Sequence, residues 1–169
     1  MFEKTLLSNL IYNEDFTRKT LPFIKPDFFR NRDEVTLFNI INAFVVKYNN
    51  LPTKEAIEIE LSNNKTLTED EYKNTKSLLN SLQHEEVEQQ WLLDTTEKFC
   101  KDRAVYNAVL QGIKIIDGKD KKHTPEAIPS ILSEALGVSF DRHIGHDYLA
   151  QTDERFDYYH RTEERLKFD

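Results

Sequence analysis

The stretch from Glu86 to Asp117, EVEQQWLLDTTEKFCKDRAVYNAVLQGIKIID, decides the fold. It contains no proline and one glycine, and its apolar residues recur three, four and seven positions apart, which is the period of an α-helix. The residues of this stripe are Trp91, Thr95, Phe99, Tyr106, Leu110, Ile113 and Ile116. At a rise of about 1.5 Å per residue the helix would span about 45 Å, which exceeds the width of a small domain. We therefore predict a long helix that projects from the rest of the chain.

A second helix is predicted to fold back along the first. Thr124, Pro125 and Glu126 resemble a helix start, because proline is favoured in a first turn, where its missing N–H costs no hydrogen bond. The apolar residues that follow at helical spacing are Ile128, Ile131, Leu132, Ala135 and Leu136. An antiparallel helical hairpin over about residues 86–140 would expose apolar side chains that need a partner. Self-association is the simplest source of that partner.

The residues before the hairpin, about 1–85, are expected to form a compact helical head. Helical spacing recurs at Phe2, Leu6, Leu7, Leu10 and Ile11; at Val35, Phe38, Ile41, Val45 and Tyr48; at Ile57 and Leu61; and at Tyr72, Leu78, Leu79 and Leu82. Head and hairpin together make an N-terminal assembly domain over 1–140. The predicted fold class is all-α.

Capping residues and prolines mark the predicted helix boundaries in this head. Asn31 or Asp33 can cap the helix that follows them, and Thr68-Glu69-Asp70-Glu71 has the form of a capping box. A short helix is expected to begin after Asp15 and to end near Pro22. Two prolines, at 22 and 26, predict an extended corner over residues 23–29.

The end of the chain is predicted to be a hinge followed by a docking helix. Residues 141–147 lack periodicity and contain the hinge residues Gly145, His146 and Asp147. An amphipathic linker helix is predicted over 148–169, with a docking stripe of Leu149, Thr152, Phe156, Tyr159 and Leu166. Burying that stripe would contribute roughly 6–12 kcal/mol gross, against an estimated 4–15 kcal/mol for free association. Docking would therefore be weak alone and stronger within a multi-subunit ring.

Composition narrows the function classes. The 169 residues include 30 acidic and 23 basic side chains, a net charge of -7 that disfavours a domain coating nucleic acid. A basic cluster, Lys119, Lys121, Lys122 and His123, reads as a loop that is either solvated or in local contact with phosphate. No apolar run approaches the roughly 20 residues of a membrane span, and the start lacks a secretory pattern. We predict a cytoplasmic protein.

Candidate catalytic groups each have a structural explanation. A phosphate-binding loop needs GxxxxGK followed by a hydroxyl residue, whereas Gly112 to Gly118-Lys119-Asp120 has five intervening residues and an aspartate. Cys100, the only cysteine, is better explained as a small buried hydrophobe than as a nucleophile. The acidic run before the long helix suits the positive end of its dipole better than acid/base chemistry.

For two further sets of residues, the sequence leaves open both a functional and a structural role. His143, His146 and Asp147 could ligate a metal, although capping around the hinge is favoured. Trp91 is either an interface anchor or a core residue. We predict no catalytic residue, no metal site and no cofactor in these 169 residues.

Several short stretches match the pattern of one known protein family, and they follow the same order along the chain. They are Leu6-Leu7-Ser8-Asn9-Leu10-Ile11-Tyr12, Trp91-Leu92, Thr96-Glu97-Lys98, Arg103-Ala104, Ala127-Ile128-Pro129, Ser139-Phe140-Asp141 and Gly145-His146-Asp147. With them the chain resembles the N-terminal part of the hexameric replicative DNA helicases of T-even-type bacteriophages, which are related to the bacterial DnaB helicases.

The resemblance implies an assembly role in phage DNA replication. Family members join a helical N-terminal domain and a linker helix to a RecA-like motor, which hydrolyses nucleoside triphosphate and unwinds DNA with 5′→3′ polarity. Their N-terminal domains pair through helical hairpins into a collar on which primase docks, and the linker helix packs on the neighbouring motor. The expected self-association residues are Trp91, Phe99, Tyr106, Leu110, Ile113, Ile128, Ile131 and Leu132.

This chain lacks the Walker motif of the motor. ATP and magnesium are therefore expected only in a motor domain outside it. Expected partners are further copies forming a hexameric ring, the neighbouring motor, primase, a helicase loader, and single-stranded DNA through the parent protein. We expect a fragment of a longer helicase. The alternatives are a stand-alone loader or adaptor that binds a motor through its last helix, and a small metal-dependent hydrolase built on the His143 region.

Overall fold

The computed structural model describes residues 1–140, and within them every regular element is a helix. The elements are α1 (Phe2–Tyr12), α2 (Glu14–Thr20), η1 (Leu21–Phe23), η2 (Pro26–Phe28), α3 (Arg32–Tyr48), α4 (Lys54–Asn63), α5 (Glu69–Ser81), α6 (Gln89–Ile116), η3 (Pro125–Ala127) and α7 (Ile128–Leu136), where η marks a 3₁₀ turn. The all-α prediction is confirmed. None of these helices is both long and apolar enough to cross a membrane.

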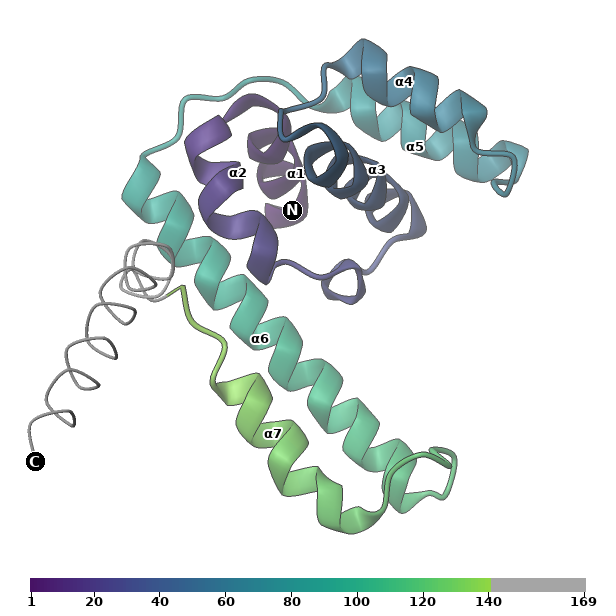
Figure 1. The fold of residues 1–169 in the computed structure, drawn as a ribbon, viewed down its shortest axis with the longest axis vertical. Coiled ribbons are helices and arrows are strands. Elements are labelled where there is room, and N and C mark those ends of the chain that lie inside the picture. The colour runs from purple at the N-terminus through teal and green to yellow at the C-terminus, as the bar shows by residue number, and fades with distance from the viewer. Residues whose placement is uncertain (141–169) are drawn as a thin grey trace, which may run out of the picture. The chain divides into compact units, whose positions relative to one another are not determined.

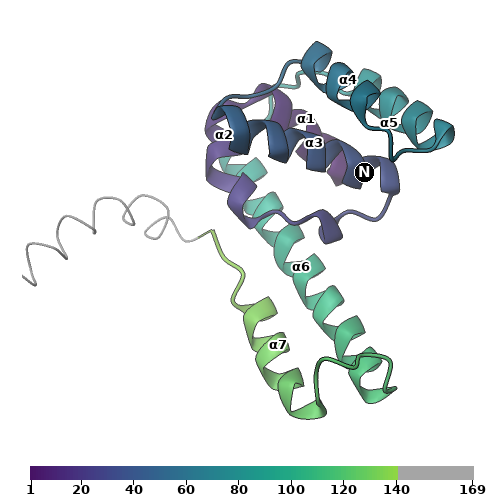
Figure 2. The ribbon, with the colours of Figure 1, turned by 45° about the vertical axis from the view of Figure 1, so that its right-hand side comes forward.

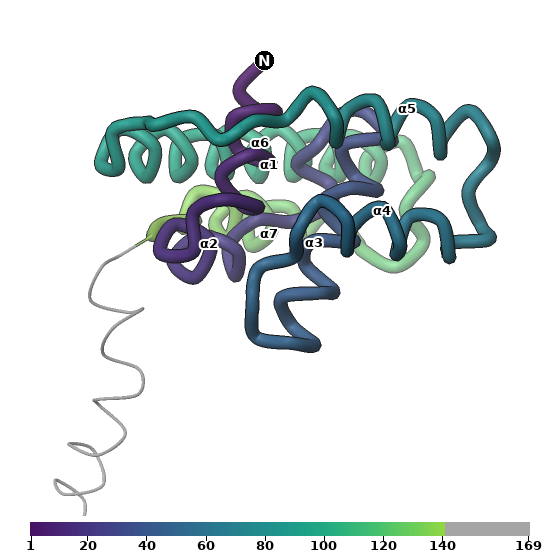
Figure 3. Tube along the Cα trace, turned by 90° about the horizontal axis from the view of Figure 1, so that it is seen from above, coloured from purple at the N-terminus to yellow at the C-terminus, as the bar shows by residue number. Residues whose placement is uncertain are grey.

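The core of the head is built around α1. Residues Met1–Val138 form one compact unit, in which α1 packs against α2 and α3, and α3 packs in turn against α4 and α5 (Figure 1). Leu6, Leu7 and Leu10 of α1 are completely buried, as are Phe16 of α2 and Leu37 of α3. Because each fully buried side chain of this size contributes roughly 1.5–3 kcal/mol, this layer accounts for much of the stability of the head. In Figure 3, α4 and α5 lie together on the side away from α2.

The segment between α2 and α3 departs from the sequence prediction. Asn13 caps α2 by accepting a hydrogen bond from the Phe16 N–H at 3.1 Å, so this helix begins at Glu14 rather than after Asp15. The extended corner expected over residues 23–29 is wrong in part: Ile24, Lys25 and Phe29 are extended, but η1 and η2 place 3₁₀ turns at Leu21–Phe23 and Pro26–Phe28. Proline fixes φ near −65°, which suits a 3₁₀ turn as well as an extended chain.

The predicted capping signals form. Thr68 Oγ1 accepts from the Glu71 N–H at 3.2 Å, and Glu71 Oε2 accepts from the Thr68 N–H at 2.9 Å, which completes the capping box of α5. Glu71 Oε1 also lies 2.7 Å from Arg32 Nη1, so this box is tied to the start of α3. Of the two candidate caps for α3, Asn31 is used, and its N–H donates to Glu34.

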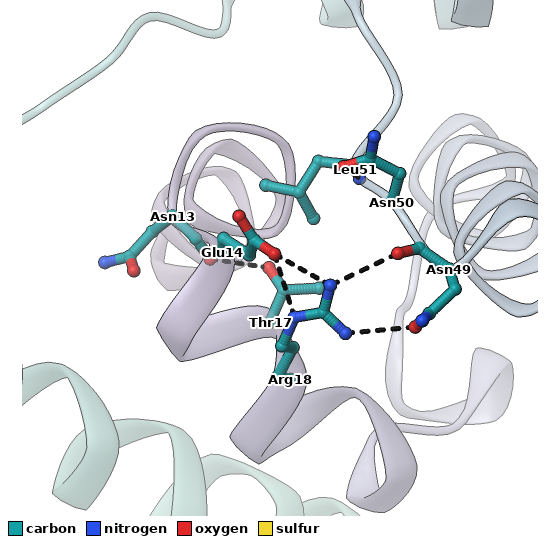
Figure 4. Close-up of polar contacts among 7 residues, drawn as sticks. All are labelled: Asn13, Glu14, Thr17, Arg18, Asn49, Asn50 and Leu51. Atoms are coloured by element: carbon teal, nitrogen blue, oxygen red, sulfur yellow. Dashed lines mark hydrogen bonds and ion pairs between the residues drawn. The ribbon is translucent and has the colours of Figure 1, made fainter.

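A polar cluster fastens the end of α3 to α2 (Figure 4). Arg18 donates from Nε and Nη2 to Glu14 Oε1, at 2.9 and 2.7 Å. The same guanidinium donates from Nη1 to Asn49 Oδ1 at 3.0 Å and from Nη2 to the Asn49 carbonyl at 3.2 Å. Asn49 ends α3 in the left-handed conformation, with φ of 51°, which asparagine tolerates better than most residues.

Candidate interaction surface

The end of α6 and the whole of α7 form an antiparallel pair that extends from the head (Figures 1 and 2). Small side chains bring the two helices close: Ala108 and Gly112 of α6 and Ala135 of α7 are buried. A Cβ atom added at Gly112 would lie 3.6 Å from Ile128 Cγ2, so α7 packs directly against the glycine backbone. Ile115 is buried on the same side of α6.

The first half of α6 belongs to the head. Leu92, Thr96 and Cys100 are completely buried there. Farther along, Arg103 Nε donates to the Phe28 carbonyl at 2.7 Å, and Asn107 Nδ2 donates to the carbonyl before it, that of Asp27, at 3.0 Å. These two hydrogen bonds join α6 to η2 at the point where the helix leaves the head.

From Tyr106 to the end of the helix, α6 exposes an apolar stripe. Its members and their exposed fractions are Tyr106 (52%), Val109 (47%), Leu110 (40%), Ile113 (50%) and Ile116 (71%). We call these five residues the apolar α6 face. Because they are three, four, seven and ten positions from the first, they share one side of the helix, which adjoins the side that Ala108, Gly112 and Ile115 turn toward α7. A contiguous exposed stripe of this kind is typical of a protein-protein contact.

The structure divides the predicted self-association residues into three groups. Tyr106, Leu110 and Ile113 lie on the apolar α6 face. Phe99 lies within the head, with its ring centroid 5.6 Å from that of Phe2, whereas Trp91 contacts Phe2 edge-on and remains 51% exposed. The three α7 residues, Ile128, Ile131 and Leu132, are half-buried.

Sequence reasoning left three exposed apolar residues out of the predicted contact. Val109 and Ile116 belong to the apolar α6 face, and Leu136 of α7 is 58% exposed. Helical spacing had already placed Ile116 on the predicted stripe, and spacing from Tyr106 could have identified Val109 as well. The predicted hinge residues Gly145, His146 and Asp147, and the docking stripe Leu149, Thr152, Phe156, Tyr159 and Leu166, lie outside the described residues.

Three features of the described residues bear on catalytic or metal chemistry. The Cys100 thiol is buried, and this burial raises its pKa to about 12, so the reactive thiolate is disfavoured, as expected for a small core residue. No group of three or more His, Cys, Asp or Glu side chains within residues 1–140 could hold a metal. A groove of about 540 Å³ between α3 and α4 is lined by Phe44 and by three titratable side chains, Lys47, Tyr48 and Glu60, and Lys47 Nζ lies 5.0 Å from the centroid of the Tyr48 ring.

Comparison with known proteins identifies a phage relative. No family model matches the chain. The chain is 31% identical over 159 residues to a DnaB-like replicative helicase of Enterobacteria phage T4. The match covers 89% of this chain and 33% of the helicase, so the chain spans about a third of the length of that relative. This finding confirms the resemblance seen in the sequence.

Proposed function

We propose that this chain is the assembly region of a phage DnaB-like replicative helicase. The premise is that the chain corresponds to the N-terminal region of such a helicase. The observation that carries the proposal is the apolar α6 face, which no residue among 1–140 covers. A second copy of the chain is its proposed occupant, because the same stripe on two copies is self-complementary in the way that a two-fold interface requires.

The size of the face sets the strength of this contact. Each of its side chains is roughly half exposed. Covering one of them therefore contributes roughly half of the 1.5–3 kcal/mol that full burial of such a residue yields. Five residues on each of two copies then supply on the order of 10 kcal/mol, against an estimated 4–15 kcal/mol for association. A single contact is therefore of moderate strength. Repetition in a closed ring raises the effective concentration and strengthens the assembly.

The wider roles in this proposal come from the family resemblance. In this proposal, pairs of copies form the collar of a hexameric ring, a motor domain outside this chain binds ATP and magnesium and unwinds DNA with 5′→3′ polarity, and primase docks on the collar. In this proposal, residues 1–140 orient the contact between copies. The head is joined to α6 through Arg103 and Asn107 and so fixes the direction of the apolar α6 face. The predicted linker helix would pack on the motor of the neighbouring subunit.

The test is the oligomeric state of the full chain, measured by light scattering over a range of concentrations. We expect dimers or larger species at concentrations on the order of 10–100 µM, consistent with a contact of moderate strength. Leu110→Glu with Ile113→Glu should yield monomers, because two carboxylates would be desolvated in the contact. Both side chains are 40–50% exposed on the surface of α6, so helix content should be unchanged.

A matched control separates this face from exposed apolar surface in general. Val46 of α3 and Ile59 of α4 are 75% and 61% exposed on the head, and Val46→Glu with Ile59→Glu introduces the same charge. This variant should assemble as the unmodified chain does. A wild-type chain that stays monomeric at about 100 µM, or a control that dissociates as readily as the α6 variant, would refute the proposal.

A further inference from the structure

The last turn of α6 and the loop that follows it together carry an excess of positive charge. Residues 114–123 contain four lysines and two aspartates, a local net charge of +2 before any contribution from His123. Both aspartates are already engaged within the loop. Asp117 Oδ2 lies 3.8 Å from Lys119 Nζ, and Asp120 Oδ1 accepts from the Lys122 N–H at 2.8 Å.

Asp120 organises the loop around itself. Its Oδ1 also accepts from the His123 N–H at 3.3 Å, and its Oδ2 lies 3.0 Å from His123 Nδ1. The hydrogen bond from the Lys122 N–H, followed by the contact with His123, lowers the pKa of this carboxyl. Gly118 turns the chain with φ of 71°, and the N–H groups of Lys119 and Asp120 donate to the Lys114 carbonyl at 2.9 and 3.1 Å. The turn is therefore a defined structure.

Three lysines at this end of the hairpin have no ion-pair partner among the described residues. No carboxylate among residues 1–140 forms an ion pair with Lys114, Lys121 or Lys122. We call these three lysines and the loop 117–124 the basic tip. An ammonium group with three donors and no partner is suited to an anionic oxygen supplied from outside.

The net charge of the chain, -7, does not cancel the positive electrostatic field of the lysines at the basic tip. From Arg103, where α6 leaves the head, to Ile116 there are 13 helical steps, which is a distance of about 20 Å. The Debye length at physiological ionic strength is about 8 Å, so more than two screening lengths separate the tip from the joint with the head. The local charge therefore decides which ions gather at the tip.

We propose that the basic tip is a sequence-independent contact for the phosphate backbone of DNA. This inference rests on the proposed function, because three lysines per copy bind weakly and gain useful affinity only when several assembled copies contact one DNA molecule. Among residues 117–124 there is no Phe, Tyr or Trp on which a base could stack. Contact is therefore with phosphates, and duplex, which has the higher charge density, binds at least as well as a single strand.

The experiment measures binding of the full chain to a fluorescent duplex and to a single strand of equal length, by anisotropy at increasing salt. The logarithm of the binding constant should fall linearly with the logarithm of salt concentration. In Lys114→Gln with Lys121→Gln and Lys122→Gln, the slope for duplex should decrease by about one for each lysine removed from a contacting copy. The control is Lys4→Gln with Lys25→Gln and Lys65→Gln, which removes the same charge from head residues that form no ion pair.

Each alternative outcome is distinct. Equal losses of slope in the two triple variants would overturn the proposal, since only net charge would then matter. Tighter binding of the single strand than of duplex would indicate base recognition and would also overturn it. If the tip variant dissociates the assembly in light scattering while the control does not, the tip is a contact between copies. If the wild-type chain is monomeric yet its salt slope depends on the tip lysines, the proposed assembly fails, and the tip contacts DNA without the gain in affinity from several copies.

Discussion

At the residue scale, Asn49 has two tasks that one substitution can separate. It ends α3 with φ of 51°, and both its carbonyl and its side-chain oxygen accept from Arg18. An alanine in the left-handed region costs about 1–2 kcal/mol, and the lost side-chain hydrogen bond roughly 1 kcal/mol more. Asn49→Ala should therefore lower the free energy of unfolding by about 2–3 kcal/mol in chemical denaturation.

The matched variant Asn49→Gly keeps the backbone conformation and the carbonyl contact while losing the side-chain acceptor. Its loss of stability should be clearly smaller than that of the alanine variant, because glycine adopts positive φ without strain. Equal losses in the two variants would mean that the left-handed conformation of residue 49 contributes nothing.

Cys100 gives a prediction that depends on pH. Burial, with a smaller effect of the nearby Glu97 carboxylate, raises its pKa to about 12, above the value of about 8.5 expected in the unfolded chain. Between pH 8 and pH 10 the folded thiol should therefore stay protonated and react slowly with a thiol reagent, whereas the chain in denaturant should react rapidly. Rapid labelling of the folded chain at pH 8 would contradict the buried position of the thiol.

At the element scale, the joint between α6 and η2 fixes where the hairpin leaves the head. Arg103→Leu removes the donor to the Phe28 carbonyl, which is partly buried, and should destabilise the chain by about 1–2 kcal/mol. Lys101→Leu, at an exposed position two residues earlier in α6, should change stability by less than about 0.5 kcal/mol. The measurement is again chemical denaturation, and similar effects of the two variants would show that the joint is not a stabilising contact.

The elements differed in how well the sequence predicted them. The start of α6 falls within three residues of its prediction, because Glu88 accepts from the N–H groups of Gln90 and Trp91 and so marks the first turn. The corner before α3 could not be predicted in the same way. Proline at 22 and 26 fixes φ but leaves ψ open, and tertiary packing of Leu21 and Phe28, both buried, selects the 3₁₀ value.

At the scale of the whole molecule, periodicity predicted which helix would carry the proposed contact between copies. It could not separate the residues of that helix that pack in the head from those that stay exposed. A spacing of three and four identifies one side of a helix without showing what covers it. Phe99 therefore belonged to the same predicted stripe as Ile113, although the structure places the first against Phe2 and leaves the second half exposed. Only the position of the head along α6, set at Arg103, separates the two.

The central claim is that the apolar α6 face is covered by a second copy of the chain. Hydroxyl-radical footprinting of the full chain at low and at high concentration measures this cover residue by residue. The account predicts that oxidation of Tyr106, Leu110 and Ile113 falls as the chain assembles, while oxidation of Val46 and Tyr48 on the head, which are at least as exposed, is unchanged. Equal oxidation of the α6 residues at both concentrations, or protection confined to the head, would contradict it.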